Sequence, residues 1–136
     1  MLVPRSVLIE LIHPDASPEV RAWASAPPEW LEETQAQQLD TSLSLELGAG
    51  GREAISLALE LHADLLLIDE RAGRKEAEAR NIAVTGTLAV LLQASMRGYI
   101  DFPQTMKQLR EYGFRTSRPI EATVMARYEQ IKKGKP

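Results

Sequence analysis

Cysteine is absent from the 136 residues of this sequence, and histidine occurs only twice. A chain without thiols forms no disulfide bond, supplies no thiolate ligand to a metal and offers no cysteine nucleophile, which suits the cytoplasm. No apolar run approaches the roughly 20 residues that a membrane-spanning helix needs. The first six residues lack the long apolar segment of a secretory signal. We therefore expect a cytoplasmic protein without a membrane partner.

A strong excess of positive charge is also missing. The chain has 16 lysines and arginines against 19 acidic residues, a formal net charge of -3. Proteins that hold nucleic acid by charge alone are usually basic, although a local basic stripe or a bound divalent cation can still hold phosphate groups. RNA thus stays open as a partner. Because 44% of the residues are hydrophobic, the chain can build a core, and its length predicts a single domain over residues 1–136.

The first third of the sequence predicts two short helices and an extended segment. We expect a helix over Val7–Ile12, since Pro4 suits the first turn of a helix, where its missing N–H is no loss. Ser17 and Pro18 predict a second helix, with the serine as N-cap and the proline at the first helical position. The residues after Trp30 predict a short edge strand.

The rest of the sequence alternates helical and strand patterns. Apolar residues recur at helical spacing from Ala54 to Leu61, and the continuous apolar run Leu65–Ile68 predicts a fully buried parallel strand. Further elements are expected over Arg71–Arg80 (helix), Ile82–Gly86 (strand), Thr87–Gly98 (helix capped by Thr87), Thr105–Tyr112 (helix, followed by Gly113 as C′ residue) and Ile120–Lys132 (helix). This order is typical of an α/β fold, a small parallel sheet flanked by helices.

Several groups of residues are similar to those of a known superfamily. The longest are Glu53–Ala58, Ala63–Asp69 and Gly86–Leu92. Shorter matches are Val3–Pro4, Val7, Glu10–Leu11, Arg71, Gly73–Arg74, Arg97–Gly98, Leu109 and Gly113–Phe114. Together they cover most of the chain, which resembles a little-characterised branch of the PIN-domain superfamily related to the RNases of toxin–antitoxin systems.

The resemblance implies an acidic metal site. In that superfamily, acids from several elements converge at the carboxyl edge of a parallel sheet and hold Mg²⁺ or Mn²⁺, which activates water for RNA cleavage. Several carboxylates are needed because hard divalent ions prefer oxygen ligands and because phosphates repel an acidic site without metal. By resemblance, the catalytic and metal-binding residues are Glu10, Glu53 and Asp69, with Glu70 as a neighbouring acid.

The chain departs from the superfamily pattern in two ways. The first strand of the family, which carries an aspartate, and the helix after it have no counterpart before Val3, so the resemblance implies a truncated PIN-like fold. The family also tends to have Gly-Glu where this chain has Gly50–Gly51, so a second acid is missing. We therefore expect weak or absent ribonuclease activity. An unpaired sheet edge would also favour a homo-oligomer.

Each candidate residue also has an ordinary structural interpretation. Asp69 and Glu53 both stand near the start of a predicted helix, where negative charge is favourable, and Glu10 alone would be a solvated carboxylate. The arginines of Arg71–Arg80 alternate with glutamates, which predicts a solvated face of salt bridges more than a phosphate site.

Three functions stay open at this point. The chain could be a PIN-like ribonuclease of the toxin type, acting on RNA and controlled by an antitoxin protein. It could instead be a degenerate PIN-like module that binds RNA or protein without cutting. It could also be a mis-started fragment of an active toxin RNase. The number of acids at the site separates the first function from the second.

Overall fold

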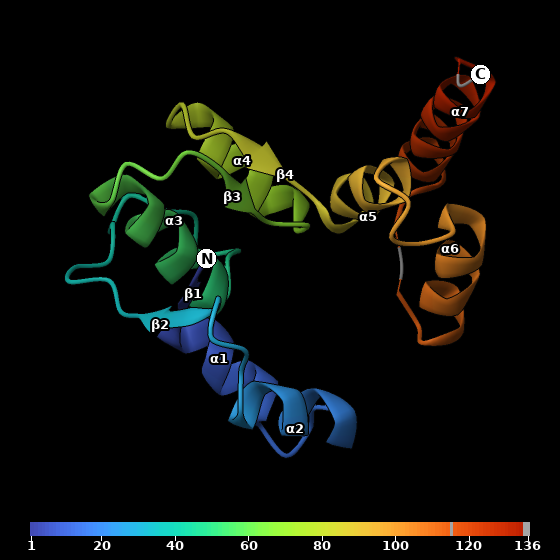
Figure 1. Cartoon of the computed structure of the whole chain (residues 1–136). Helices are drawn as coiled ribbons and strands as arrows, with labels where there is room; N and C mark the ends of the chain where they lie inside the picture. Colours follow the sequence, from blue (N-terminus) through green and yellow to red (C-terminus); the bar gives the residue numbers. More distant parts are fainter. Residues whose placement is uncertain (115, 135–136) are drawn as a thin grey trace. The chain divides into compact units, whose positions relative to one another are not determined.

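The chain divides into two compact units in the computed structural model, which describes residues 1–114 and 116–134 (Figure 1). The N-terminal unit, residues 1–85, contains β1 (Leu2–Pro4), α1 (Arg5–Ile12), α2 (Pro18–Ser25), β2 (Glu32–Thr34), α3 (Ala49–Glu60), β3 (Leu66–Leu67), α4 (Arg71–Ala79) and β4 (Val84–Thr85). The C-terminal unit, residues 86–136, contains α5 (Thr87–Met96), α6 (Phe102–Glu111) and α7 (Arg118–Gly134).

The strands of the N-terminal unit form two parallel pairs, β1 with β2 and β3 with β4. The predicted α/β class and the parallel strand direction are therefore confirmed, although the strands form two short ladders instead of one small sheet. The extended segment after Trp30 is confirmed as β2. Strand β1 was not expected, because three residues are too few to show an alternating pattern. Its place beside β2 depends on a partner 30 residues away, which pairs Leu2 with Glu32.

The strand predicted over Leu65–Ile68 exists, but the prediction that it is fully buried was wrong. Leu66 donates its N–H to Ala83 O at 2.9 Å, and Ile68 is buried. Leu65 and Leu67, however, are 57% and 44% exposed. Successive side chains of a strand point to opposite faces, and only one face of this two-residue ladder packs against the core. A continuous apolar run therefore did not mean a strand covered on both sides.

The helices of the N-terminal unit begin close to where the sequence predicts. Ser17 caps α2 by accepting a hydrogen bond from Val20 N at 3.3 Å, as expected from the serine–proline pair. Helix α3 is the exception, because it begins at Ala49, before the apolar stripe predicted from Ala54, with Gly48 as its N-cap and Gly50 and Gly51 inside its first turn. Its inner face packs with α4 and the loop before α3, and the buried residues of this core are Leu43, Leu47, Ile55, Ala58, Ala77 and Ile82.

The C-terminal unit has a separate apolar core. Its buried residues are Leu88, Leu92, Phe102 and Met106, with Phe102 fully inaccessible and stacked on Tyr128 at 5.3 Å between ring centroids. Gly113 has a φ of +91°, the left-handed conformation expected of a helix C′ residue. The predicted cap of α5 was wrong, because Gly86, not Thr87, stands at the N-cap. No helix within the described residues is both long and apolar enough to cross a membrane.

Candidate acidic site

The first turn of α3 is a meeting point of three segments. Its second and third residues are Gly50 and Gly51, which have no side chains to keep neighbours away. A Cβ atom on Gly50 would stand 3.0 Å from Glu10 Oε1 and 3.1 Å from Val7 Cγ2. Helix α1 therefore packs closely on α3 at Gly50, and a larger residue there would require Glu10 and Val7 to shift by a few tenths of an ångström.

A second carboxylate reaches the next residue of the same turn. A Cβ atom on Gly51 would lie 3.5 Å from Glu70 Oε2, an ordinary van der Waals distance. Glu70 is the N-cap residue of α4, and Glu10 belongs to α1. Two acids from different helices thus meet at the N-terminus of a third helix, where exposed N–H groups and the helix dipole favour negative charge.

Glu53 lies one turn further along α3, with its carboxylate already engaged. It is buried, at 5% exposure, and Oε1 accepts a hydrogen bond from Ser6 N at 2.7 Å while Oε2 accepts one from Ala36 N at 3.3 Å. Helix α1 begins after Pro4, whose side chain cannot cap the free N–H groups of the first turn. Glu53 therefore serves as a cap for α1, supplied from another helix 47 residues away.

Asp69 lies two residues after the end of β3, close to the strand end at which the sequence predicts it. Its side chain is exposed, and Glu70 follows it at the start of α4. The structure thus places Glu10 and Glu70 beside the same turn of α3, and Asp69 precedes Glu70 in the chain. The carboxylate of Glu53 instead binds the backbone N–H groups of Ser6 and Ala36.

The oxygen ligands at this turn have the right chemistry for Mg²⁺ or Mn²⁺. Their arrangement does not make a complete binding site. Among the residues that the structure describes, no three histidine, aspartate or glutamate side chains lie close enough together to hold a metal ion. The donor set therefore does not fit a catalytic ion as it stands, and no reaction step is derived through one.

A family model described as PIN domain matches residues 1–130. The chain belongs to the PIN-domain family. No curated protein and no solved structure matches it. The matched range spans both units, and the resemblance drawn from Glu53–Ala58, Ala63–Asp69 and Gly86–Leu92 is confirmed at the level of the family.

Membership of the PIN-domain family points to nuclease-type chemistry on nucleic acid, and PIN domains generally use divalent metals. The resemblance to the family predicts an acid at the position of Gly51 in this PIN domain. A Cβ atom at Gly51 would make ordinary contacts with the Glu70 carboxylate and with Leu47, so an acidic side chain there would lie beside Glu70.

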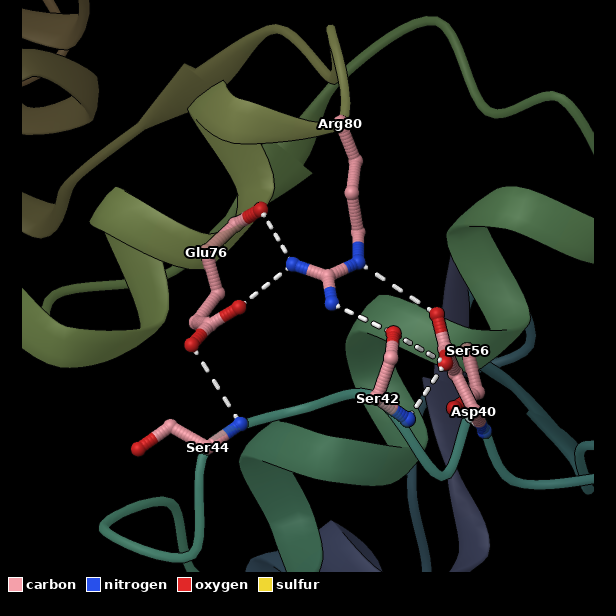
Figure 2. Close-up of polar contacts among 6 residues, drawn as sticks. All are labelled: Asp40, Ser42, Ser44, Ser56, Glu76 and Arg80. Atoms are coloured by element: carbon pink, nitrogen blue, oxygen red, sulfur yellow. Dashed lines mark hydrogen bonds and ion pairs between the residues drawn. The ribbon is translucent and has the colours of Figure 1, made fainter.

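A second polar cluster of this PIN domain was missed by sequence reasoning (Figure 2). Arg80, at the end of α4, donates from Nε to Asp40 Oδ2 at 3.3 Å, from Nη2 to Ser42 Oγ at 2.8 Å and from Nη1 to the backbone oxygen of Glu76 at 3.0 Å. It also forms an ion pair with the Glu76 carboxylate. The salt bridge with Glu76 agrees with the predicted alternation of arginines and glutamates along this helix. The prediction that Arg80 is solvated was wrong, because its side chain is only 18% exposed.

The cluster fastens the loop before α3 to α4. Ser42 donates both its Oγ–H and its backbone N–H to Asp40 Oδ1, and these two hydrogen bonds, with help from Arg80, lower the pKa of Asp40 below its ordinary value of 3.8. The hydrogen bond with Glu76 is the main cause that raises the pKa of Arg80. Because Glu76 also accepts from Ser44 N at 3.3 Å, the polar groups of the cluster are paired with one another, which indicates a structural role.

The same loop is held along one face of α3. Glu53, Ser56 and Glu60 recur at spacings of three and four residues, which places them on one side of a helix. Their side chains accept hydrogen bonds from the backbone N–H groups of Ala36, Gln37, Gln38 and Asp40. The only sequence signal for this arrangement was the polar stripe itself, which does not say whether solvent or a loop covers it.

Proposed function

We propose that this PIN-domain protein associates with nucleic acid, that it descends from a Mg²⁺- or Mn²⁺-dependent ribonuclease, and that its ribonuclease activity is weak or absent. Membership of the family supports the nucleic-acid association. The low ribonuclease activity is supported by the small number of carboxylates at the first turn of α3, which are those of Glu10 and Glu70. The proposal assigns the protein to the cytoplasm, in keeping with the absence of cysteine.

One observation carries the proposal: the first turn of α3 brings together two carboxylates, Glu10 and Glu70, around two residues without side chains. A catalytic divalent ion acts by neutralising the charge that develops on phosphate oxygens, and carboxylate ligands must hold it in place. Of the other predicted ligands, Glu53 accepts two backbone hydrogen bonds. We propose that Glu10 and Asp69 are the remaining ancestral acids and that Glu53 acts mainly as the cap of α1.

The test is to restore the missing acid. In the Gly51→Glu variant, the new Cβ makes only ordinary contacts, the nearest at 3.5 Å from Glu70, and the new carboxylate joins the acids of that turn. We expect the unmodified protein to cleave a labelled single-stranded RNA little or not at all in Mg²⁺ or Mn²⁺. Gly51→Glu should bind Mn²⁺ more tightly, seen as a larger rise in melting temperature on adding the ion, and should gain metal-dependent cleavage.

Gly51→Gln is the matched control, because it adds a side chain of the same size without the charge. It should show neither the metal-dependent rise in melting temperature nor the gain in cleavage. The proposal is wrong if the unmodified protein cleaves RNA strongly with Mn²⁺ and loses that activity in Asp69→Asn or Glu10→Gln.

We also propose that the chain self-associates and that a protein of the antitoxin type is a second partner. Exposed apolar side chains support self-association: Leu65 and Leu67 lie on the open side of β3, and Ile9 is 51% exposed on α1. Soluble monomers rarely leave large apolar patches uncovered, and a two-fold pair covers one patch with its copy. Light scattering at micromolar concentration should give at least twice the chain mass of 15.1 kDa; a monomer mass contradicts the proposal.

A further inference from the structure

Charge is distributed very unevenly between the two units. The N-terminal unit has 7 lysines and arginines against 15 acidic residues, a formal net charge of -8. The C-terminal unit has 9 lysines and arginines against 4 acidic residues, a formal net charge of +5. Although the net charge of the whole chain is -3, its C-terminal unit is basic, and a basic unit attracts a polyanion such as nucleic acid.

Most cations of the C-terminal unit are available to a partner. Arg110 is paired with Glu121. Six others are exposed and form no ion pair with any described residue: Arg97, Lys107, Arg118, Arg127, Lys132 and Lys133. Unpaired surface cations are the groups that neutralise nucleic-acid phosphates and release the counterions around them.

One of these cations, Lys132, lines a cavity of about 490 Å³ within this unit. The cavity is lined by Met96, Tyr99, Ile100, Tyr128, Ile131 and Lys132, among others. Arg97 and Lys133 are chain neighbours of these lining residues. The cavity thus combines aromatic and apolar walls with the cation of Lys132, and its volume is in the range of pockets that hold small organic groups.

The two tyrosines that line the cavity differ in how much of the ring is packed against other residues. Tyr128 is held in place by stacking on Phe102, whereas Tyr99 is 76% exposed. One acid, Asp101, also lines the cavity, but its carboxylate caps α6 by accepting from Gln104 N at 3.0 Å. The face of Tyr99 is therefore the surface on which a flat ring entering the cavity can stack.

We infer that the C-terminal unit binds single-stranded nucleic acid, with Arg97, Lys132 and Lys133 contacting phosphates and an unpaired base entering the cavity beside Tyr99. Aromatic stacking next to a positively charged surface is how proteins hold single strands. A base in a duplex is already stacked and paired, so it cannot enter a cavity without being extruded. This inference rests on the proposed nucleic-acid association and adds where, and in what form, the strand is bound.

The first test measures binding of a fluorescent oligouridine RNA to the full chain by anisotropy at several salt concentrations. The double variant Arg97→Gln/Lys132→Gln should weaken binding and reduce the slope of log K against log salt by about 1.4, since each phosphate contact to a single strand contributes about 0.7. The matched control, Arg71→Gln/Lys75→Gln on α4, removes the same two residue types from the other unit and should change the slope little.

The second test isolates stacking from charge. Tyr99→Ala should lower the affinity at least about fivefold without changing the salt slope, and Tyr99→Phe should keep it, because a phenylalanine ring stacks equally well. The matched control is Tyr112→Ala, which removes a 91% exposed tyrosine of the same unit that does not line the cavity. Its affinity should stay at the unmodified value.

Different failures separate the two proposals. If the unmodified protein binds no RNA at all, the nucleic-acid association itself is wrong. If it binds, but the α4 control variant weakens binding as much as the Arg97/Lys132 variant, only the location is wrong. Displacement of the RNA by polyglutamate at equal charge, together with an unaffected Tyr99→Ala variant, would instead indicate an acidic protein as the partner and overturn the inference.

Discussion

The two units of this PIN domain use their charged side chains in different ways. In the N-terminal unit, carboxylates of α3 and α4 accept hydrogen bonds from distant backbone, as when Glu53 caps α1 and Glu76 holds Ser44. In the C-terminal unit, the side-chain hydrogen bonds of Asp101 and Ser117 reach only three residues along the chain, and an apolar cluster around Phe102 joins the helices.

In this chain, charged side chains of one unit make intramolecular hydrogen bonds, whereas charged side chains of the other unit are available to a binding partner. A carboxylate that satisfies a buried N–H stabilises the fold, but it is then less available to a ligand. An exposed lysine such as Lys132 contributes little to stability and is free to meet a phosphate. Stability and binding should therefore respond to different residues in the two units.

The largest effect is expected in the apolar core of the C-terminal unit. Phe102→Ala removes a fully buried ring and its stacking on Tyr128, which should cost about 3 to 5 kcal/mol. Hydrogen exchange of the α5–α7 amides should rise, while exchange in α3 should stay nearly unchanged. Tyr112→Ala, at a 91% exposed position, is the control and should change the stability by less than about 0.5 kcal/mol.

The next effect compares neighbouring positions of β3. Leu66 packs against the core of the N-terminal unit, whereas Leu65 is 57% exposed. Leu66→Asp places a charge against apolar groups and should lower the free energy of unfolding by about 2 to 4 kcal/mol. Leu65→Asp should cost far less in a urea titration followed by circular dichroism. Equal losses in the two variants would show that both faces of the strand are covered.

A smaller loss is expected when the cap of α1 is changed. Glu53→Gln keeps one acceptor oxygen but turns an NH₂ group toward a backbone donor, Ser6 N or Ala36 N. We expect the free energy of unfolding to fall by about 2 kcal/mol without any metal present. Glu10→Gln, at an exposed position, should have little effect. If Glu53 were only a metal ligand, its substitution in a chelating buffer would leave the stability unchanged.

The smallest effect concerns the pH dependence of the Asp40 cluster. The pKa of Asp40 is lowered in the folded protein, mainly by the hydrogen bonds from Ser42. The stabilisation is therefore present above the ordinary pKa of 3.8 and is lost as the pH falls through the lower folded value. Asp40→Asn should flatten this part of a plot of melting temperature against pH below about 4. A curve as steep as that of the unmodified protein would contradict the assigned role of Asp40.

Local signals predicted most elements well because they depend on neighbouring residues. The Ser17–Pro18 pair marks the start of α2 by satisfying a nearby N–H and presetting a helical φ, and Gly113 ends α6 because it adopts a positive φ without strain. The alternation of helical and apolar segments was sufficient to predict parallel strands, since such strands need a crossover between them.

Contacts between residues that are far apart along the chain account for the features that were not predicted or were predicted wrongly. Strand β1 exists through its pairing with β2, and the exposure of Leu65 follows from how little of β3 is covered. The inward position of Arg80 depends on Asp40, which is 40 residues away. None of these partners can be recognised from residues that are adjacent in sequence.

The sequence by itself determined the family, the α/β class, the starts of α2 and α4 and the absence of an acidic side chain at positions 50 and 51. Only the tertiary structure decided that Glu53 caps α1, that Glu10 and Glu70 meet at one turn of α3, and that the free cations belong to the C-terminal unit. The physical reason is that a side chain's type sets what it can bind, whereas its partners are chosen by the packing of segments far apart in the chain.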